Sequence, residues 1–327
     1  MFKIIGMTKL IWKLFKIVLT LLLAFLMYVV IGGVVPFLHH PDVSQTKKEA
    51  VESTQFYSDS VGPDRATIIE DNEEALKMRL RVIKDAQKTL ILSTFDFRSD
   101  DAGKDILAAL LNAADRGVKV EIFADGFNSI IQMENNDYFY ALSSNKNIKI
   151  IIYNQVNILI PWNGLGRMHD KYVIADDSLY ILGGRNTFGY FLGDYAGHKN
   201  YDRDVLVYNT GSKASSIYQI KDYYKKITSQ KCCSVFHCNE SLGEKNSVKK
   251  AEQELKKRYE SLENKYDKFL AENYDYKANT YETNKINLLS NPTSLYTKQP
   301  TVYYGLMYLA KNAKKEVKIH TPYIICN

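Results

Sequence analysis

The segment at positions 166–186 brings together side chains that could act on a phosphate ester. Its sequence, GRMHDKYVIADDSLYILGGRN, places His169, Lys171 and Asp176 in the spacing H-x-K-x4-D within an otherwise apolar stretch. Residues two apart on a strand share one face, so His169 and Lys171 are expected to project in the same direction. An imidazole can attack an electrophile, and an ammonium neutralises phosphate charge. The pair therefore predicts chemistry on an anionic phosphate ester.

The residues after Lys171 predict a β-hairpin that positions this pair. The apolar run YVIA is typical of a strand buried on both faces, DDS is a turn signal, and LYIL returns as a second strand. That strand ends at Gly183 and Gly184, where the absence of a Cβ allows close backbone approach. The hairpin would bring Asn186 back toward the end at which His169 lies.

The complete pattern, H-x-K-x4-D followed by Gly-Gly-x-Asn, resembles the HKD signature of the phospholipase D superfamily. Every fixed position of that motif is present, and the chain is similar to bacterial cardiolipin synthase-like membrane proteins. The resemblance implies hydrolysis or transfer of phosphodiesters through a phosphohistidine intermediate. It also implies that the reaction needs neither a metal ion nor another cofactor.

The resemblance assigns His169 as the nucleophile. A neutral imidazole attacks best when an acceptor orients its far nitrogen. Asp202 is the expected acceptor by its position in the family pattern, and Asp204 is the second choice, because on a strand the two carboxylates share one face. Asp176 is the third letter of the motif, and we interpret it as largely structural, anchoring the turn and nearby backbone.

The remaining candidate site residues are expected to bind substrate. Lys171 and Asn186 would bind the non-bridging phosphate oxygens, and Gly183 and Gly184 would permit close approach. The apolar loop NILIPWNGLG lies just before His169 and contains Trp162, which is expected either near acyl chains or in core packing or a lid.

The sequence around the motif predicts an α/β fold. Residues 89–125 read as strand, loop, helix and strand, with apolar residues at helical spacing and a closing Arg-Gly. This βαβ unit implies parallel pairing. Further strands are expected at 147–153 and 201–208. The resemblance implies a phospholipase D-like α-β-α sandwich with a mixed, largely parallel sheet.

The N-terminus predicts a membrane anchor over residues 1–38. The alternative is a cleaved signal peptide, whose apolar core is usually shorter and which would need a cleavage site after Gly33. Residues 17–37 are uncharged and almost wholly apolar, which is long enough for one crossing. Lysines at positions 3, 9, 13 and 16 place the N-terminus in the cytoplasm by the positive-inside rule. We therefore expect a single-pass cell-membrane protein with an extracytoplasmic catalytic region, joined by a linker over 39–65 to a first phospholipase D-like domain over 66–230.

The C-terminal part predicts a helical insertion over 231–300 and the start of a second, incomplete repeat over 301–327. The segment NAKKEVKIHTPYI at 312–324 is similar to DAQKTLILSTFDF at 85–97, and a strand is expected at 317–325. No second H-x-K-x4-D occurs in the sequence, so the chain is expected to be truncated relative to the family and inactive alone. A homodimer, or the missing half of a longer product, would supply the second histidine as general acid.

The anchor and the apolar loop favour a membrane phospholipid as substrate and partner. The alternatives are a nuclease-type phosphodiesterase and a non-catalytic membrane protein with a vestigial domain. The net charge of +6 fits phosphate-bearing substrates as well as many ordinary enzymes. The sequence lacks the basic, aromatic-interleaved runs of nucleic-acid-binding proteins, so nucleic acid is not the expected partner.

The cysteines do not predict a metal site. Cys232, Cys233 and Cys238 cluster in CCSVFHC, but adjacent cysteines without a second pair do not match zinc spacings. An extracytoplasmic location would permit a disulfide between Cys238 and either Cys232 or Cys233.

Overall fold

The computed structural model describes residues 2–237, 240–270, 274–293 and 295–319. Its centre is a nine-stranded sheet with the order β8-β4-β3-β2-β5-β6-β7-β1-β9 in this part of the chain. The strands are β1 Asp64–Ile69, β2 Thr89–Thr94, β3 Lys119–Asp125, β4 Ile148–Tyr153, β5 Tyr172–Ala175, β6 Leu179–Gly183, β7 Asp204–Asn209, β8 Cys233–Val235 and β9 Tyr281–Glu282.

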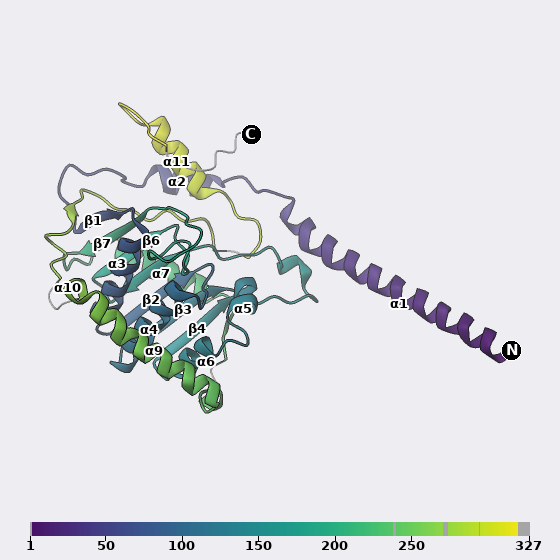
Figure 1. Ribbon diagram of the computed structural model, residues 1–327. Helices are drawn as coiled ribbons and strands as arrows, with labels where there is room; N and C mark the ends of the chain where they lie inside the picture. The colour runs from purple at the N-terminus through teal and green to yellow at the C-terminus, as the bar shows by residue number, and fades with distance from the viewer. Residues whose placement is uncertain (1, 238–239, 271–273, 294, 320–327) are drawn as a thin grey trace.

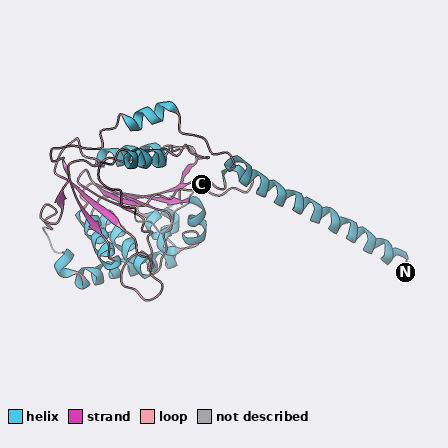
Figure 2. Ribbon diagram, turned by 90° about the horizontal axis from the view of Figure 1, so that it is seen from above, coloured by secondary structure: helices cyan, strands magenta, loops and turns pink. Residues whose placement is uncertain are grey.

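Helices cover both faces of the sheet, which gives three layers (Figure 2). The α-helices are α1 Phe2–Val34, α2 Gln45–Glu52, α3 Asn72–Asp85, α4 Asp101–Asp115, α5 Gly126–Gln132, α6 Asp137–Ser144, α7 Ile217–Thr228, α8 Glu240–Gly243, α9 Asn246–Lys265, α10 Asp267–Leu270 and α11 Thr301–Lys311. Two 3₁₀ helices, η1 Val35–Phe37 and η2 Pro161–Asn163, complete the set. The larger core packs the sheet against α3, α4, α6 and α9, and the smaller core packs it against α7.

The α-β-α architecture confirms the predicted fold class, but the expectation of a largely parallel sheet is wrong. Only β2 with β3 and β3 with β4 pair in parallel. All other neighbours in the described sheet are antiparallel, including β5 with β6 and β6 with β7. The β5–β6 hairpin turns back directly, without the crossover that a parallel pair requires.

The predicted βαβ unit is confirmed, and a side-chain cap and two glycines define where its helix α4 begins and ends. The Asp100 side chain caps α4 by accepting from the backbone N–H of Gly103. A Cβ at Gly103 would lie 1.8 Å from the backbone oxygen of Arg98, so only glycine fits this turn. The helix buries Ile106, Leu107 and neighbours against the sheet, and the chain leaves it at Gly117 with φ +96°.

The amphipathic helix predicted in the region 231–300 is present as α9. Its buried face includes Val248, Ala251, Leu255 and Leu262, and it lies across α4 and α6 (Figure 1). The same region also contributes β8 beside β4 and β9 beside β1. These residues therefore complete the sheet in addition to forming helices.

The first and last described helices lie outside the sheet and its covering layers. Helix α1 projects away from it, and Met7–Phe37 is a stretch long and apolar enough to cross a membrane (Figure 1). The region expected as a linker contains α2, which packs beside α11, and β1 already begins at Asp64. The strand expected at 317–325 is not formed over 317–319, and its other residues lie outside the described part of the chain.

Candidate active site

The HKD hairpin is formed by β5 and β6, whose antiparallel pairing places Tyr172 opposite Leu182. His169 and Lys171 lie just before β5 rather than within a strand. Lys171 Nζ donates a hydrogen bond to the backbone oxygen of His169 at 2.8 Å and lies 3.2 Å from Nδ1 of the ring. The imidazole and the ammonium are therefore in direct contact.

The two side chains differ in exposure, and desolvation lowers the pKa of both. His169 is exposed, with its ring centroid 4.4 Å from that of Phe95, whereas Lys171 is buried. Desolvation, together with the charge of Lys171, lowers the pKa of His169 below its usual value. Burial lowers the pKa of Lys171 to about 8. Near neutral pH the ring is therefore neutral while most of the ammonium remains charged.

The contact also determines where the ring carries its proton. A protonated Lys171 has only donors, so it donates to Nδ1, and the single proton of the neutral ring then lies on Nε2. In this state Nε2 is a donor. An attack by Nε2 requires Lys171 to leave Nδ1 and the ring proton to move there.

His169 and Lys171 line a cavity of about 480 Å³. Its basic residues are Arg167, His169, Lys171 and Lys298. Its apolar residues are Leu182, Ile220, Leu288, Leu289 and Val302. A cavity lined by both cationic and apolar side chains suits a ligand that combines a phosphate with hydrocarbon.

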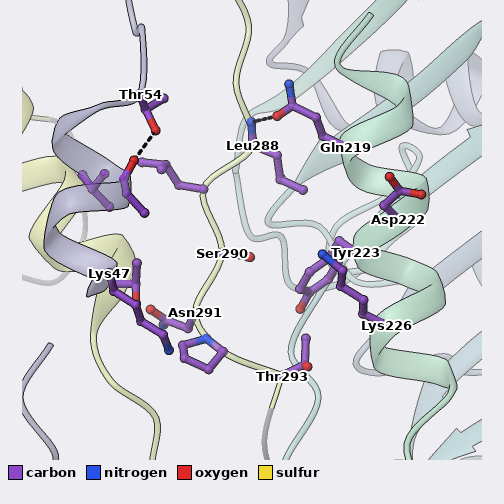
Figure 3. Close-up of a pocket in the computed structure, with 15 residues that line it drawn as sticks. Lys47, Thr54, Gln219, Asp222, Tyr223, Lys226, Leu288, Ser290, Asn291 and Thr293 are labelled. Carbon is purple, nitrogen blue, oxygen red and sulfur yellow. Dashed lines mark hydrogen bonds between the residues drawn. The ribbon is translucent and has the colours of Figure 1, made fainter. Parts of the chain in front are cut away.

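Part of the cavity wall comes from the segment between β9 and α11. The backbone N–H of Leu288 donates to Gln219 Oε1 of α7 at 2.8 Å, which ties this segment to the helix. A second cavity, of about 680 Å³, lies on the other side of residues 288–291, between α2 and α7 (Figure 3). Tyr223 borders both cavities and donates to the Asp170 carboxylate at 2.5 Å. Lys298 and Tyr223 were not predicted, because neither lies in a motif.

Asn186 lies at the edge of the site. Its side-chain oxygen accepts a hydrogen bond from the backbone N–H of Asp96 at 3.2 Å. Asp96 directly follows Phe95, the ring that packs against His169. The amide is thus tied to the loop after β2, on the imidazole side of the sheet.

Asp176 lies at the opposite end of the hairpin and acts on the backbone. Its carboxylate accepts hydrogen bonds from the backbone N–H groups of Gln87, Lys88 and Thr89 at 2.8–2.9 Å. Its own φ of +52° places it in the left-handed region, which Asp tolerates better than most residues. The third letter of the motif therefore joins the β5–β6 turn to the start of β2.

Residues 80–227 match the family described as "Cardiolipin synthase, PLD-like domain". Residues 80–227 thus form a phospholipase D-like domain. A cardiolipin synthase B from Salmonella typhi is 32% identical over 142 residues, which cover 43% of this chain and 34% of that protein. An uncharacterized protein of Helicobacter pylori strain J99 is 28% identical over 286 residues, covering 80% of this chain and 54% of that protein.

The chain thus spans about half of the length of the longer-matching curated relative, and a smaller share of the cardiolipin synthase. Among solved structures, NucT from Helicobacter pylori is similar with a TM-score of 0.42 and 21% identity, covering 53% of this chain and 99% of that chain.

The carboxylate expected to orient the phospholipase D-type histidine is not bonded to it. In the described part of the chain, the Asp202 side chain accepts from the backbone N–H of Arg203 at 2.7 Å, and Lys171 occupies the position beside His169 Nδ1. A Cβ at Gly184 would lie 2.0 Å from Asp202 Oδ2. The lack of a side chain at Gly184 therefore makes room for this carboxylate.

The second choice, Asp204, is wrong as the orienting group. It is fully buried on β7, where its Oδ2 accepts from Arg79 Nη1 at 2.9 Å and Arg185 Nη1 at 3.1 Å. A Cβ at Gly183 would lie 1.8 Å from Asp204 Oδ1, so this glycine also accommodates a carboxylate. Asp204 and Asp202 do not share one face of a strand, because β7 begins only at Asp204.

Trp162 lies outside the cavity that contains His169. It belongs to η2 and packs edge-on against Tyr28 of α1, with ring centroids 6.4 Å apart. Of the two roles expected for this loop, the structure shows packing, and the packing partner is the apolar helix.

No group of three or more metal-ligating side chains occurs among the described residues. Cys232 and Cys233 are half-buried free thiols, and Cys238 lies outside the described residues, so the disulfide expectation is not tested. The neighbouring thiol lowers the pKa of Cys232 to about 7 and raises that of Cys233.

Proposed function

We propose that this chain is a phospholipase D-type phosphodiesterase or phosphatidyltransferase that acts on membrane phospholipids through a phosphohistidine at His169. The contact between an exposed, neutral imidazole and a buried ammonium at the wall of a basic cavity carries this proposal. The apolar wall beside them supports a lipid in preference to a wholly polar phosphodiester.

The reaction begins when phosphate oxygens draw the Lys171 ammonium away from Nδ1. The ring proton then shifts to Nδ1, and the Nε2 lone pair attacks phosphorus. A phosphorus–nitrogen bond forms as the bond to the leaving oxygen breaks. Lys171, with Asn186, neutralises charge on the non-bridging oxygens. Asp170 and Asp125 act electrostatically on His169 and would stabilise the protonated ring, and Asp202, which acts on Lys171, is the further carboxylate proposed for this role.

The leaving alkoxide takes its proton from a second histidine. We propose that this group belongs to a second phospholipase D-like unit, supplied by a homodimer partner or by the repeat that begins at 301–327. Residues 1–38 anchor the protein by a single pass, and the lysines before the apolar run orient the catalytic region outward.

The chemistry is tested with bis(p-nitrophenyl) phosphate, whose nitrophenolate leaves without protonation and so needs no second histidine. Single-turnover release of nitrophenolate should accompany a phosphoryl adduct on His169, detected by mass spectrometry under alkaline conditions. His169→Ala should abolish both signals. His198→Ala is the matched control, because His198 is exposed and bonds only to Asn200 among polar groups of the described chain.

The substrate class is tested in parallel with phosphatidylglycerol vesicles and with a single-stranded DNA oligonucleotide. An adduct from the lipid alone supports the proposal. An adduct from DNA alone identifies a nuclease-type enzyme. If none of the three substrates, the lipid, the DNA or the nitrophenyl ester, forms an adduct, catalysis by this chain is contradicted.

A further inference from the structure

The loop before His169 packs against the apolar helix at three points. Tyr28 Oη donates to the backbone oxygen of Leu159 at 3.0 Å, and the Tyr28 ring meets Trp162. A Cβ at Gly32 would lie 2.7 Å from Pro161 Cγ, so a glycine allows the loop to approach the helix closely. These contacts fix the position of the loop along the axis of α1, beside Tyr28 and Gly32.

The part of α1 that the loop contacts lies inside the apolar segment of the helix. Tyr28 and Gly32 belong to the candidate membrane span Met7–Phe37. At a rise of 1.5 Å per residue, Tyr28 lies about 14 Å below Phe37 along the helix axis. If α1 crosses a bilayer, a loop held beside Tyr28 and Gly32 lies at the depth of lipid rather than above it.

The exposed side chains of the loop and of the nearby helix α5 are apolar, as a position at lipid depth requires. We define the apolar rim as Phe127 and Ile131 of α5 with Ile158, Leu159, Trp162 and Leu165 of the loop. All six side chains are exposed, and Leu159 is 66% exposed. Neither α5 nor residues 155–166 contain a charged residue, and a charge at membrane depth is costly. Phe127 lines a crevice together with the loop residues Val156 and Gly164, so α5 and the loop lie side by side.

The loop also pairs part of its own backbone internally, which lowers the cost of removing it from water. The backbone N–H groups of Ile160, Asn163, Gly164 and Gly166 donate to carbonyl oxygens within the loop. Asn154 Nδ2 also donates to the loop carbonyl oxygens of Asn163 and Gly166.

We propose that the apolar rim is embedded in the leaflet on the catalytic side of the membrane that α1 spans. The partner of this surface is the lipid bilayer. Arg167, the first charged residue after the loop, is paired with Asp125 and lines the cavity with His169. The rim thus holds the cavity mouth at the level of lipid phosphates. This inference rests on the proposed anchoring by α1 and deepens the proposed function, without depending on the chemistry at His169.

The chain has two tryptophans, so Trp12→Phe leaves Trp162 as the only one. The full chain carrying this substitution is reconstituted in phosphatidylcholine–phosphatidylglycerol vesicles with acyl-brominated lipid. Trp162 emission should fall about twofold, and the water-soluble quencher acrylamide should have little effect. The control is Trp12→Phe/Trp162→Phe/Tyr281→Trp, in which the single tryptophan stands at the exposed position 281 on the edge strand β9. Its emission should respond only to acrylamide.

Trp162→Phe leaves Trp12 as a reporter of α1. Quenching of Trp12 by brominated lipid without quenching of Trp162 overturns the rim proposal while the anchor stands. If neither is quenched, both the anchor and the rim fail, whereas the nitrophenyl ester assay still reports on His169. Quenching of Trp162 in a chain that forms no adduct supports the rim and removes only the proposed chemistry.

Discussion

The lysine beside the imidazole determines which states of the site can react. While Lys171 donates to Nδ1, the ring proton lies on Nε2, so in the proposed reaction His169 cannot attack until a phosphate draws the ammonium away. This arrangement links nucleophile activation to anion binding. It also predicts two ionisations with separate origins.

Adduct formation should follow a bell-shaped pH profile. The rate should rise as His169 loses its proton, at a pKa that burial and Lys171 hold below the usual 6.5, because only the neutral ring attacks. It should fall as pH passes about 8, where Lys171 loses its charge. Single-turnover nitrophenolate release, quenched and quantified from pH 5 to 10, measures both limbs.

Lys171→Arg identifies the group behind the alkaline limb. A guanidinium stays charged throughout this range, so the fall near pH 8 should disappear even if the overall rate is lower. An unchanged alkaline limb in the arginine variant would show that another group titrates there.

At the scale of elements, the two ends of the HKD hairpin have different roles: one end lines the cavity and the other holds the start of β2. His169 and Lys171 lie at the cavity, while Asp176 binds three backbone N–H groups at the start of β2. The motif letter that is most distant from the chemistry therefore sets the position of the other two.

Asp176→Ala should lower the free energy of unfolding by about 2 kcal/mol, because it removes charged hydrogen bonds and leaves alanine in the left-handed region. Asp176→Asn, which tolerates that backbone conformation, should cost less. Asp177→Asn is the control, since its ion pairs with Lys221 and Lys213 are on the surface and contribute about 0–1 kcal/mol. Urea unfolding of the full chain in detergent measures all three, and equal losses for Asp176→Ala and Asp177→Asn would contradict this role.

Sequence patterns identified the elements with long apolar repeats and missed those defined by pairing alone. The periodicity in β2, α4 and β3 predicted a parallel unit, and turn residues predicted the β5–β6 hairpin. β8 and β9 are too short to carry a pattern. Lys298 reaches the cavity only through the path taken by the segment after β9, which no local signal encodes. Asp204 was misassigned because strand alternation does not reveal Arg79, which comes from a distant helix.

At the scale of the whole molecule, α9 is joined to α4 over the larger core by an ion pair with a buried carboxylate. Arg258 of α9 donates to the Asp105 carboxylate of α4, which is 1% exposed and also accepts from Tyr195. Desolvation already raises the pKa of Asp105 despite these partners. The pair thus fixes α9 at one position on the domain.

Arg258→Met should destabilise the fold by about 2 kcal/mol at pH 7.5, because it leaves a buried carboxylate without its cation. A raised folded-state pKa means that ionisation penalises the fold, so the loss should shrink as pH falls toward 4, because the buried carboxyl of Asp105 takes up a proton more readily in the folded state than in the unfolded chain. Lys257→Met, at the adjacent exposed position, is the control. Urea unfolding at both pH values tests the sign, and a loss that grows on acidification would contradict it.

The position of β1 has a consequence for how the protein is made. β1 pairs along its whole length with β7 and also with β9, although both partners are synthesised much later. Local contacts form quickly, whereas pairings across such long loops are slow. An early strand with two open edges is prone to aggregation while it waits. The time between the emergence of residue 64 and that of residue 282 is therefore the interval in which a nascent chain most needs a chaperone.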